Sequence, residues 1–150
     1  MKKHTLFLAL ALLLAFPLAP LLSGQEKREH KEPDTELGKT MEKFNGAWRK
    51  LRKQAADPAA NASSLELVAT IQAGLEKAFT LTPAKAADVP AAAREKFIQS
   101  YHAKLKEFIA LLPGLQTALK ANDNAAAQAI VQKMGTTQRE DHKEFKRPEM

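Results

Sequence analysis

The stretch TELGKTMEKFNGAWRKLRKQ, residues 35–54, decides the fold class. Its large apolar residues recur at alternating intervals of four and three positions: Leu37, Met41, Phe44, Trp48 and Leu51. This spacing places them on one face of an α-helix and leaves the charged residues on the other faces. Asp34, just before the stretch, is a residue type that caps helix N-termini. We therefore predict an amphipathic helix from about Asp34 to Gln54.

Three further stretches show the same helical periodicity. One covers residues 64–79 and can be capped by Ser63 or Ser64. Another covers residues 91–121, and the Pro113-Gly114 pair inside it should kink or split the helix, because proline lacks the N–H that a helix interior needs. The last runs from Asn124 to about Lys146. Its inward positions are expected to be Ala127, Ile130 or Val131, Met134, Gln138, His142 and Phe145.

These helices predict an all-α fold. No stretch alternates apolar and polar residues in the manner of a half-buried strand, so no strand is expected. Four helices joined by mostly short connections favour an antiparallel up-down-up-down four-helix bundle. We place this bundle at residues 34–147, followed by a short tail at 148–150.

The first 24 residues have the character of a secretory signal peptide. Lys2 and Lys3 precede a leucine-rich apolar run, and a turn-prone segment follows. The alternative is a retained membrane anchor, but the unbroken apolar core from Thr5 to Phe16 is shorter than the roughly 20 residues that span a bilayer. We expect cleavage near Ser23 or Gly24, leaving no stable membrane anchor, and a flexible charged arm at residues 25–33.

Composition excludes several classes of function. The chain has no cysteine, so it has neither disulfides nor thiolate metal ligands. Beyond residue 24 it carries 21 basic and 17 acidic side chains, because two of the 23 Lys and Arg lie in the leader and none of the 17 Asp and Glu do. The charges are mixed along every segment, so no nucleic-acid partner is predicted. No catalytic triad, phosphate loop or zinc spacing is present, and no enzyme activity is expected.

Topology gives Met41 and His142 a possible joint role. In an up-down-up-down bundle the start of the first helix and the end of the fourth lie at the same end. At 1.5 Å per residue, Met41 lies about 10 Å and His142 about 7 Å from that end. A thioether and an imidazole on facing helices suit the two axial positions of a haem iron. The simpler alternatives are a core methionine and a histidine that interacts with the helix dipole.

A haem site also needs apolar walls and cations for the propionates. Phe44 and Phe108 are the candidate walls, with Leu105, Trp48 and Phe145 as further possibilities. Lys146 and Arg147 follow His142 within about one turn and are the candidate cations.

Four segments resemble the cytochrome b562 family of periplasmic four-helix haem carriers. ELGKTMEKFN (36–45) resembles the opening helix with its ligand methionine, and LTPAK (81–85) resembles the Thr-Pro connection. FIALLPGLQTALKAN (108–122) resembles the third helix, in which Phe108 takes the place of a haem-pocket phenylalanine. AQAIVQKMGTTQREDHKEFK (127–146) resembles the final helix, where a TT pair precedes the ligand histidine.

The resemblance implies that Met41 and His142 ligate the iron of one non-covalent haem b. It implies a periplasmic one-electron carrier, a monomer that serves redox partner proteins whose identity the sequence does not give. Two residues depart from the family pattern: Gln138 replaces an arginine and Asp141 replaces a tyrosine. The alternatives are a haem-free periplasmic bundle that acts as a binding or stress-related interaction protein, and a structural dimer.

Overall fold

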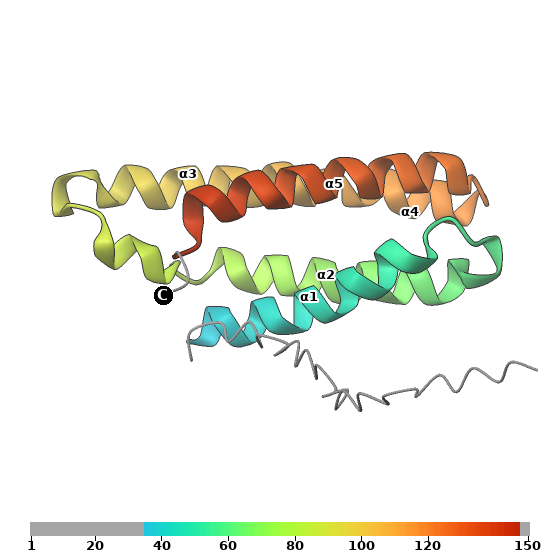
Figure 1. Cartoon of the computed structure of the whole chain (residues 1–150), viewed down its shortest axis with the longest axis horizontal. Helices are drawn as coiled ribbons and strands as arrows, with labels where there is room; N and C mark the ends of the chain where they lie inside the picture. Colours follow the sequence, from blue (N-terminus) through green and yellow to red (C-terminus); the bar gives the residue numbers. More distant parts are fainter. Residues whose placement is uncertain (1–34, 148–150) are drawn as a thin grey trace, which may run out of the picture. The chain divides into compact units, whose positions relative to one another are not determined.

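The computed structural model describes residues 35–147, and throughout that range the chain is helical with no strand (Figure 1). Its elements are α1 (Glu36–Gln54), η1 (Pro58–Ala60), α2 (Asn61–Phe79), η2 (Ala84–Asp88), α3 (Ala91–Ile109), α4 (Leu112–Lys120) and α5 (Asn124–Phe145). The helix α1 packs along α2, while α5 packs against α3 and α4, which both also contact α2. The predicted four-helix bundle is confirmed, with α3 and α4 together forming its third helix. The predicted signal peptide, the charged arm and the tail lie outside the described residues.

The N-terminus of α1 is capped by Thr35. Its hydroxyl oxygen accepts a hydrogen bond from the backbone N–H of Gly38 at 3.0 Å, which satisfies one of the donors that a helix leaves free at its start. The prediction that Asp34 is the cap is therefore wrong, and Asp34 itself lies outside the described residues.

The second helix begins at Asn61, three positions earlier than the serine pattern predicted. Asp57 starts the preceding η1 turn, where its carboxylate accepts from the N–H of Ala59 at 2.9 Å. Neither Ser63 nor Ser64 caps α2: the Ser63 hydroxyl donates to a backbone carbonyl, and Ser64 is completely buried. Both serine hydroxyls accept hydrogen bonds from the Gln54 amide, so they join α1 to α2.

The predicted interruption of the third helix is confirmed as a split. The helix α3 ends at Ile109 and α4 begins at Leu112. A proline ring clashes with the carbonyl four residues earlier, and for Pro113 that residue is Ile109. Pro113 itself lies in the first turn of α4, where no intrahelical N–H bond is required.

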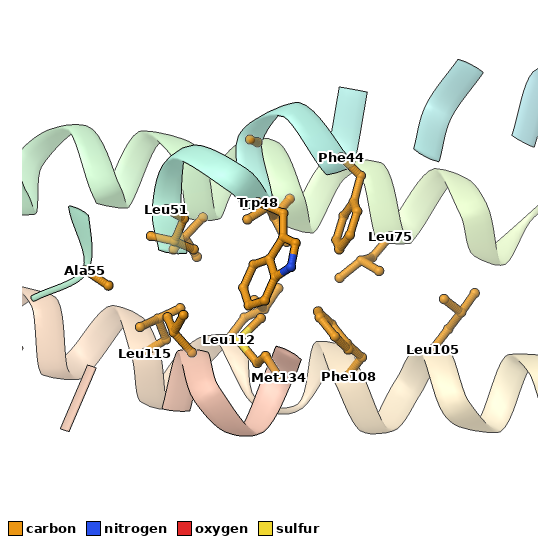
Figure 2. Close-up of a cluster of buried hydrophobic side chains, with 14 of the residues drawn as sticks. Phe44, Trp48, Leu51, Ala55, Leu75, Leu105, Phe108, Leu112, Leu115 and Met134 are labelled. Atoms are coloured by element: carbon orange, nitrogen blue, oxygen red, sulfur yellow. The ribbon is translucent and has the colours of Figure 1, made fainter. Parts of the chain in front are cut away.

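The core consists of apolar side chains from every helix, and Figure 2 shows its central part. Phe44, Trp48 and Phe108 form edge-to-face contacts, with ring centroids 5.9 Å apart for Phe44 and Phe108 and 6.2 Å apart for Trp48 and Phe108. The buried indole N–H of Trp48 has no hydrogen-bond acceptor. In Figure 2 its nitrogen lies on the side of the two phenylalanines, where an N–H can contact an aromatic ring.

Three asparagines join the helices at the end of the bundle where α4 turns into α5. The Asn61 amide donates to the side-chain oxygens of Asn122 at 2.8 Å and Asn124 at 3.3 Å. The Asn124 amide donates to the Asn61 side chain at 2.8 Å and to the carbonyl of Ala55 at 2.9 Å. Asn122 adopts a left-handed conformation with φ of 55°, which asparagine tolerates better than most residues. This asparagine cluster therefore connects the end of α1, the start of α2 and the α4–α5 turn.

Replacing Asn124 by alanine is expected to lower the free energy of unfolding by about 2 kcal/mol, because it leaves the buried Asn61 side chain and the Ala55 carbonyl with fewer partners. Urea denaturation of the purified protein measures this loss. The matched control is Gln128→Ala, an exposed position on the same helix, where a change within about 0.5 kcal/mol is expected. Equal stabilities of the two variants would contradict the assigned role of the cluster.

Candidate functional site

Two contacts fix the register of α1 against α5. The Asn45 side-chain oxygen accepts a hydrogen bond from the Gln138 amide at 3.2 Å. One turn deeper, a Cβ built on Gly135 would lie 3.7 Å from the Trp48 ring. The helices are antiparallel, so four residues back along α1 and four residues on along α5 reach the same level. Met41 and His142 are the residues at that level.

The two candidate ligands differ in exposure. Met41 is half-buried and packs against the core, whereas His142 is exposed. Exposure alone does not fix the direction of the imidazole, so the inward orientation of His142 stays a prediction. In Figure 1 the first turns of α1 and the last turns of α5 lie apart.

The two predicted wall residues lie together beside Met41. Phe44 follows Met41 by one turn on the same face of α1, and it contacts Phe108 of α3 in the core. Both rings are almost fully buried, with 3% and 4% of their surface exposed. The structure therefore places an apolar aromatic pair one turn deeper in the bundle than Met41.

The two predicted cations have different surroundings. Lys146 directly follows α5 and is half-buried. The Arg147 guanidinium donates to both oxygens of the Asp88 carboxylate, at 2.6 Å and 2.7 Å. This pairing was not predicted, because Asp88 belongs to η2 and lies 59 positions away in sequence. Arg147 is therefore held by an acid of the protein itself.

The residues that depart from the family pattern also have defined surroundings. Gln138 bonds to Asn45, as described above. Asp141 is half-buried, and burial raises the pKa of its carboxyl; Glu107 and Glu144 add to this rise, whereas Lys104 opposes it. The neighbouring Glu144 is exposed, unlike Asp141. Across residues 35–147, no group of three or more His, Cys, Asp or Glu side chains is placed to hold a metal ion.

His102 of α3 is half-buried and stacks on Phe79, with the ring centroids 4.4 Å apart and the planes inclined by 29°. It also contacts the neighbouring Tyr101 ring. The helical periodicity of residues 91–121 gives no signal for this stacking, which depends on where α2 ends.

Tyr101 provides a prediction for alkaline pH. Its hydroxyl donates to the carbonyl of Ala78 at 3.4 Å, and burial raises its pKa to about 12. Between about pH 10 and pH 12 the unfolded chain releases a proton that the folded protein keeps, so the free energy of unfolding falls as the pH rises. We expect Tyr101→Phe to lose less stability than the wild type over this range, as measured by urea denaturation at pH 9 and pH 11.5. Parallel losses in both proteins would contradict the prediction.

Comparison with known proteins identifies the family. The family model for cytochrome b562 matches residues 36–146, from the first residue of α1 to one residue beyond α5. The chain therefore belongs to the cytochrome b562 family, whose members are typically non-enzymatic electron carriers that bind haem b. Among curated proteins and among solved structures, the chain has no significant match. Within residues 35–147, no helix combines the length and apolar character needed to cross a membrane.

Proposed function

We propose that this protein is an exported b-type cytochrome that binds one haem b without a covalent bond and carries single electrons. The observation that carries the proposal is the register of α1 and α5. The Asn45–Gln138 hydrogen bond and the Trp48–Gly135 contact support the proposal, because in this register residues 41 and 142 lie at one level on two different helices. Membership of the cytochrome b562 family supports the same assignment.

The donor set fits haem b. A thioether and a neutral imidazole are both established axial ligands of haem iron, and the absence of cysteine from the chain agrees with non-covalent binding. Both candidate ligands keep accessible surface, so each can contact a bound group. Haem supplies an iron that alternates between two oxidation states. Met41 and His142 would hold this iron, and a haem held by a thioether and an imidazole would supply one-electron chemistry and favour electron transfer.

The other residues shape the surroundings of the ligands. Phe44 and Phe108 exclude water from the deeper side of the site, and a dry environment of this kind influences the reduction potential. Lys146 and Arg147, which follow the turn that carries His142, are the cations proposed to accompany the propionates, and the Arg147 guanidinium also pairs with Asp88.

The cellular setting follows from the leader and the family. The signal peptide predicted at residues 1–24 directs the chain to the periplasm, where the mature protein acts as a monomer between redox partner proteins. The sequence does not give the identity of these partner proteins. The proposal includes no enzymatic step and no nucleic-acid contact.

An absorption spectrum tests the proposal directly. The exported, purified protein is recorded oxidised and then reduced with dithionite, with haemin added first if the protein is colourless. We expect sharp α and β bands on reduction, which are typical of a six-coordinate low-spin haem. A protein that stays colourless in the presence of haemin would overturn the proposal and favour the haem-free interaction protein.

A further inference from the structure

The last turn of α5, which carries His142, is capped by a lysine from a distant segment. The final carbonyls of a helix have no partner within the helix and need one from elsewhere. The His142 carbonyl accepts from the backbone N–H of Lys146 at 3.0 Å. The next two, those of Lys143 and Glu144, both accept from the ammonium group of Lys85, which lies 58 and 59 positions away. A positive charge at this place also interacts favourably with the helix dipole.

A second contact from the same segment holds Arg147, which lies two residues beyond the end of α5. Asp88 binds Arg147 through two hydrogen bonds, as described above, and both Lys85 and Asp88 belong to η2. The segment is itself fixed to α3: Arg94 donates to the carbonyls of Ala86 at 2.9 Å and Val89 at 3.3 Å. A single short connection between α2 and α3 is therefore attached to α3 on one side and to the end of α5 on the other.

The opposite face of the turn is attached by packing. Phe145 is buried against Phe97 and Tyr101 of α3, with ring centroids 5.3 Å and 5.5 Å apart. This contact fixes the position of the helix end, but it does not satisfy any carbonyl. Lys85 therefore supplies hydrogen bonds that the packing of Phe145 does not supply. These bonds keep residues 142–145 in helical form.

We propose that residues 84–88 act as a latch that holds the His142 turn in helical form, with Lys85 and Asp88 as positioning residues for the axial imidazole. This inference rests on the proposed function, because it concerns the binding of haem through His142. When the last turn frays, only a fraction of the molecules present the imidazole in the correct orientation, and haem affinity falls by that fraction. Losing either latch contact is expected to weaken haem binding by at most about fivefold, since an exposed bidentate pair or a charged helix cap contributes up to about 1 kcal/mol.

The test compares Lys85→Met and Asp88→Asn with Lys133→Met, an exposed lysine of α5 outside the latch. Haem affinity is measured by haemin titration of the haem-free mature protein, and the reduction potential is measured on the loaded protein. Hydrogen exchange of the haem-free protein reports the backbone amides of residues 142–146. We expect both latch variants to lose haem affinity, to exchange faster at these amides and to shift the potential. Lys133→Met should match the wild type.

A charge exchange separates the latch from a direct role of Arg147 at the propionates. The Asp88→Arg and Arg147→Asp variants are each expected to bind haem more weakly, and the double variant should recover most of the loss because the pair is restored with reversed charges. If Arg147 instead served the propionates, Asp88→Asn would leave haem affinity unchanged or raise it, and the double variant would not recover. Either result would overturn the latch.

The two proposals fail in different ways. If the wild type binds haem and both latch variants bind it with equal affinity and equal potential, the latch is overturned and the cytochrome assignment stands. If the wild type takes up no haemin, the cytochrome assignment fails and the inference about an axial imidazole fails with it.

Discussion

Replacing His142 by alanine is expected to abolish the six-coordinate low-spin spectrum of the haem-loaded protein. The imidazole is one of two axial ligands in the proposed site, and the neighbouring acidic side chains of α5 are poor substitutes for it. The loss of haem affinity should exceed the roughly 10–100-fold that losing a hydrogen-bond partner of a metal ligand costs. Absorption spectra of the oxidised and reduced protein, together with a haemin titration, measure both effects.

His102→Ala is the matched control, because it removes a histidine of α3 that stacks on Phe79 of α2. We expect it to keep the wild-type spectrum, with at most a modest loss of stability. Met41→Ala should also lose the six-coordinate spectrum, since the thioether occupies the opposite axial position in the proposed site. A His142→Ala protein with sharp bands in the reduced state would show that another side chain ligates the iron.

Replacing Leu115 by alanine should produce the largest loss of stability among single apolar substitutions in α4. Leu115 has 0% of its surface exposed and lies within the cluster shown in Figure 2. Truncating a fully buried leucine costs about 3 kcal/mol, because the transfer free energy of the lost methyl groups adds to that of the cavity left behind. Urea denaturation should be performed on the haem-free protein, since bound haem would stabilise both proteins and mask the difference.

Leu111→Ala is the control for this measurement. Leu111 lies at the break between α3 and α4 and is only half-buried, so we expect a loss of about 1 kcal/mol. Similar losses at the two positions would indicate that α4 is not packed as the structure describes.

The helices and the core could be predicted from the sequence because both depend on local spacing. The intervals between Phe44, Trp48 and Leu51 are those of one helix face, and all three are buried. The split of the third helix could be predicted in the same way, since the steric effect of Pro113 acts on a residue four positions away. The level of Met41 and His142 followed from helix lengths and topology alone.

The exposure of His142 and the surroundings of Arg147 could not be predicted in this way. Whether an inward position is covered depends on the crossing of a facing helix, and periodicity carries no information about that crossing. The pairing of Arg147 with Asp88 and the capping by Lys85 join positions 58 or 59 apart. With 23 basic and 17 acidic residues in the chain, charge alone does not single out these pairs.

The split between α3 and α4 bears on how the molecule opens. A continuous third helix would transmit fraying along its whole length, but the interruption at Ala110 and Leu111 ends the regular hydrogen-bond ladder there. We expect the part of the molecule built on α3 to open locally while α4 and the asparagine cluster stay folded. In the proposed cytochrome, haem would then enter or leave through a partial unfolding of low free-energy cost. Native-state hydrogen exchange of the haem-free protein would show this as slower exchange in α4 than in α3, and equal rates would mean that the bundle opens as one cooperative unit.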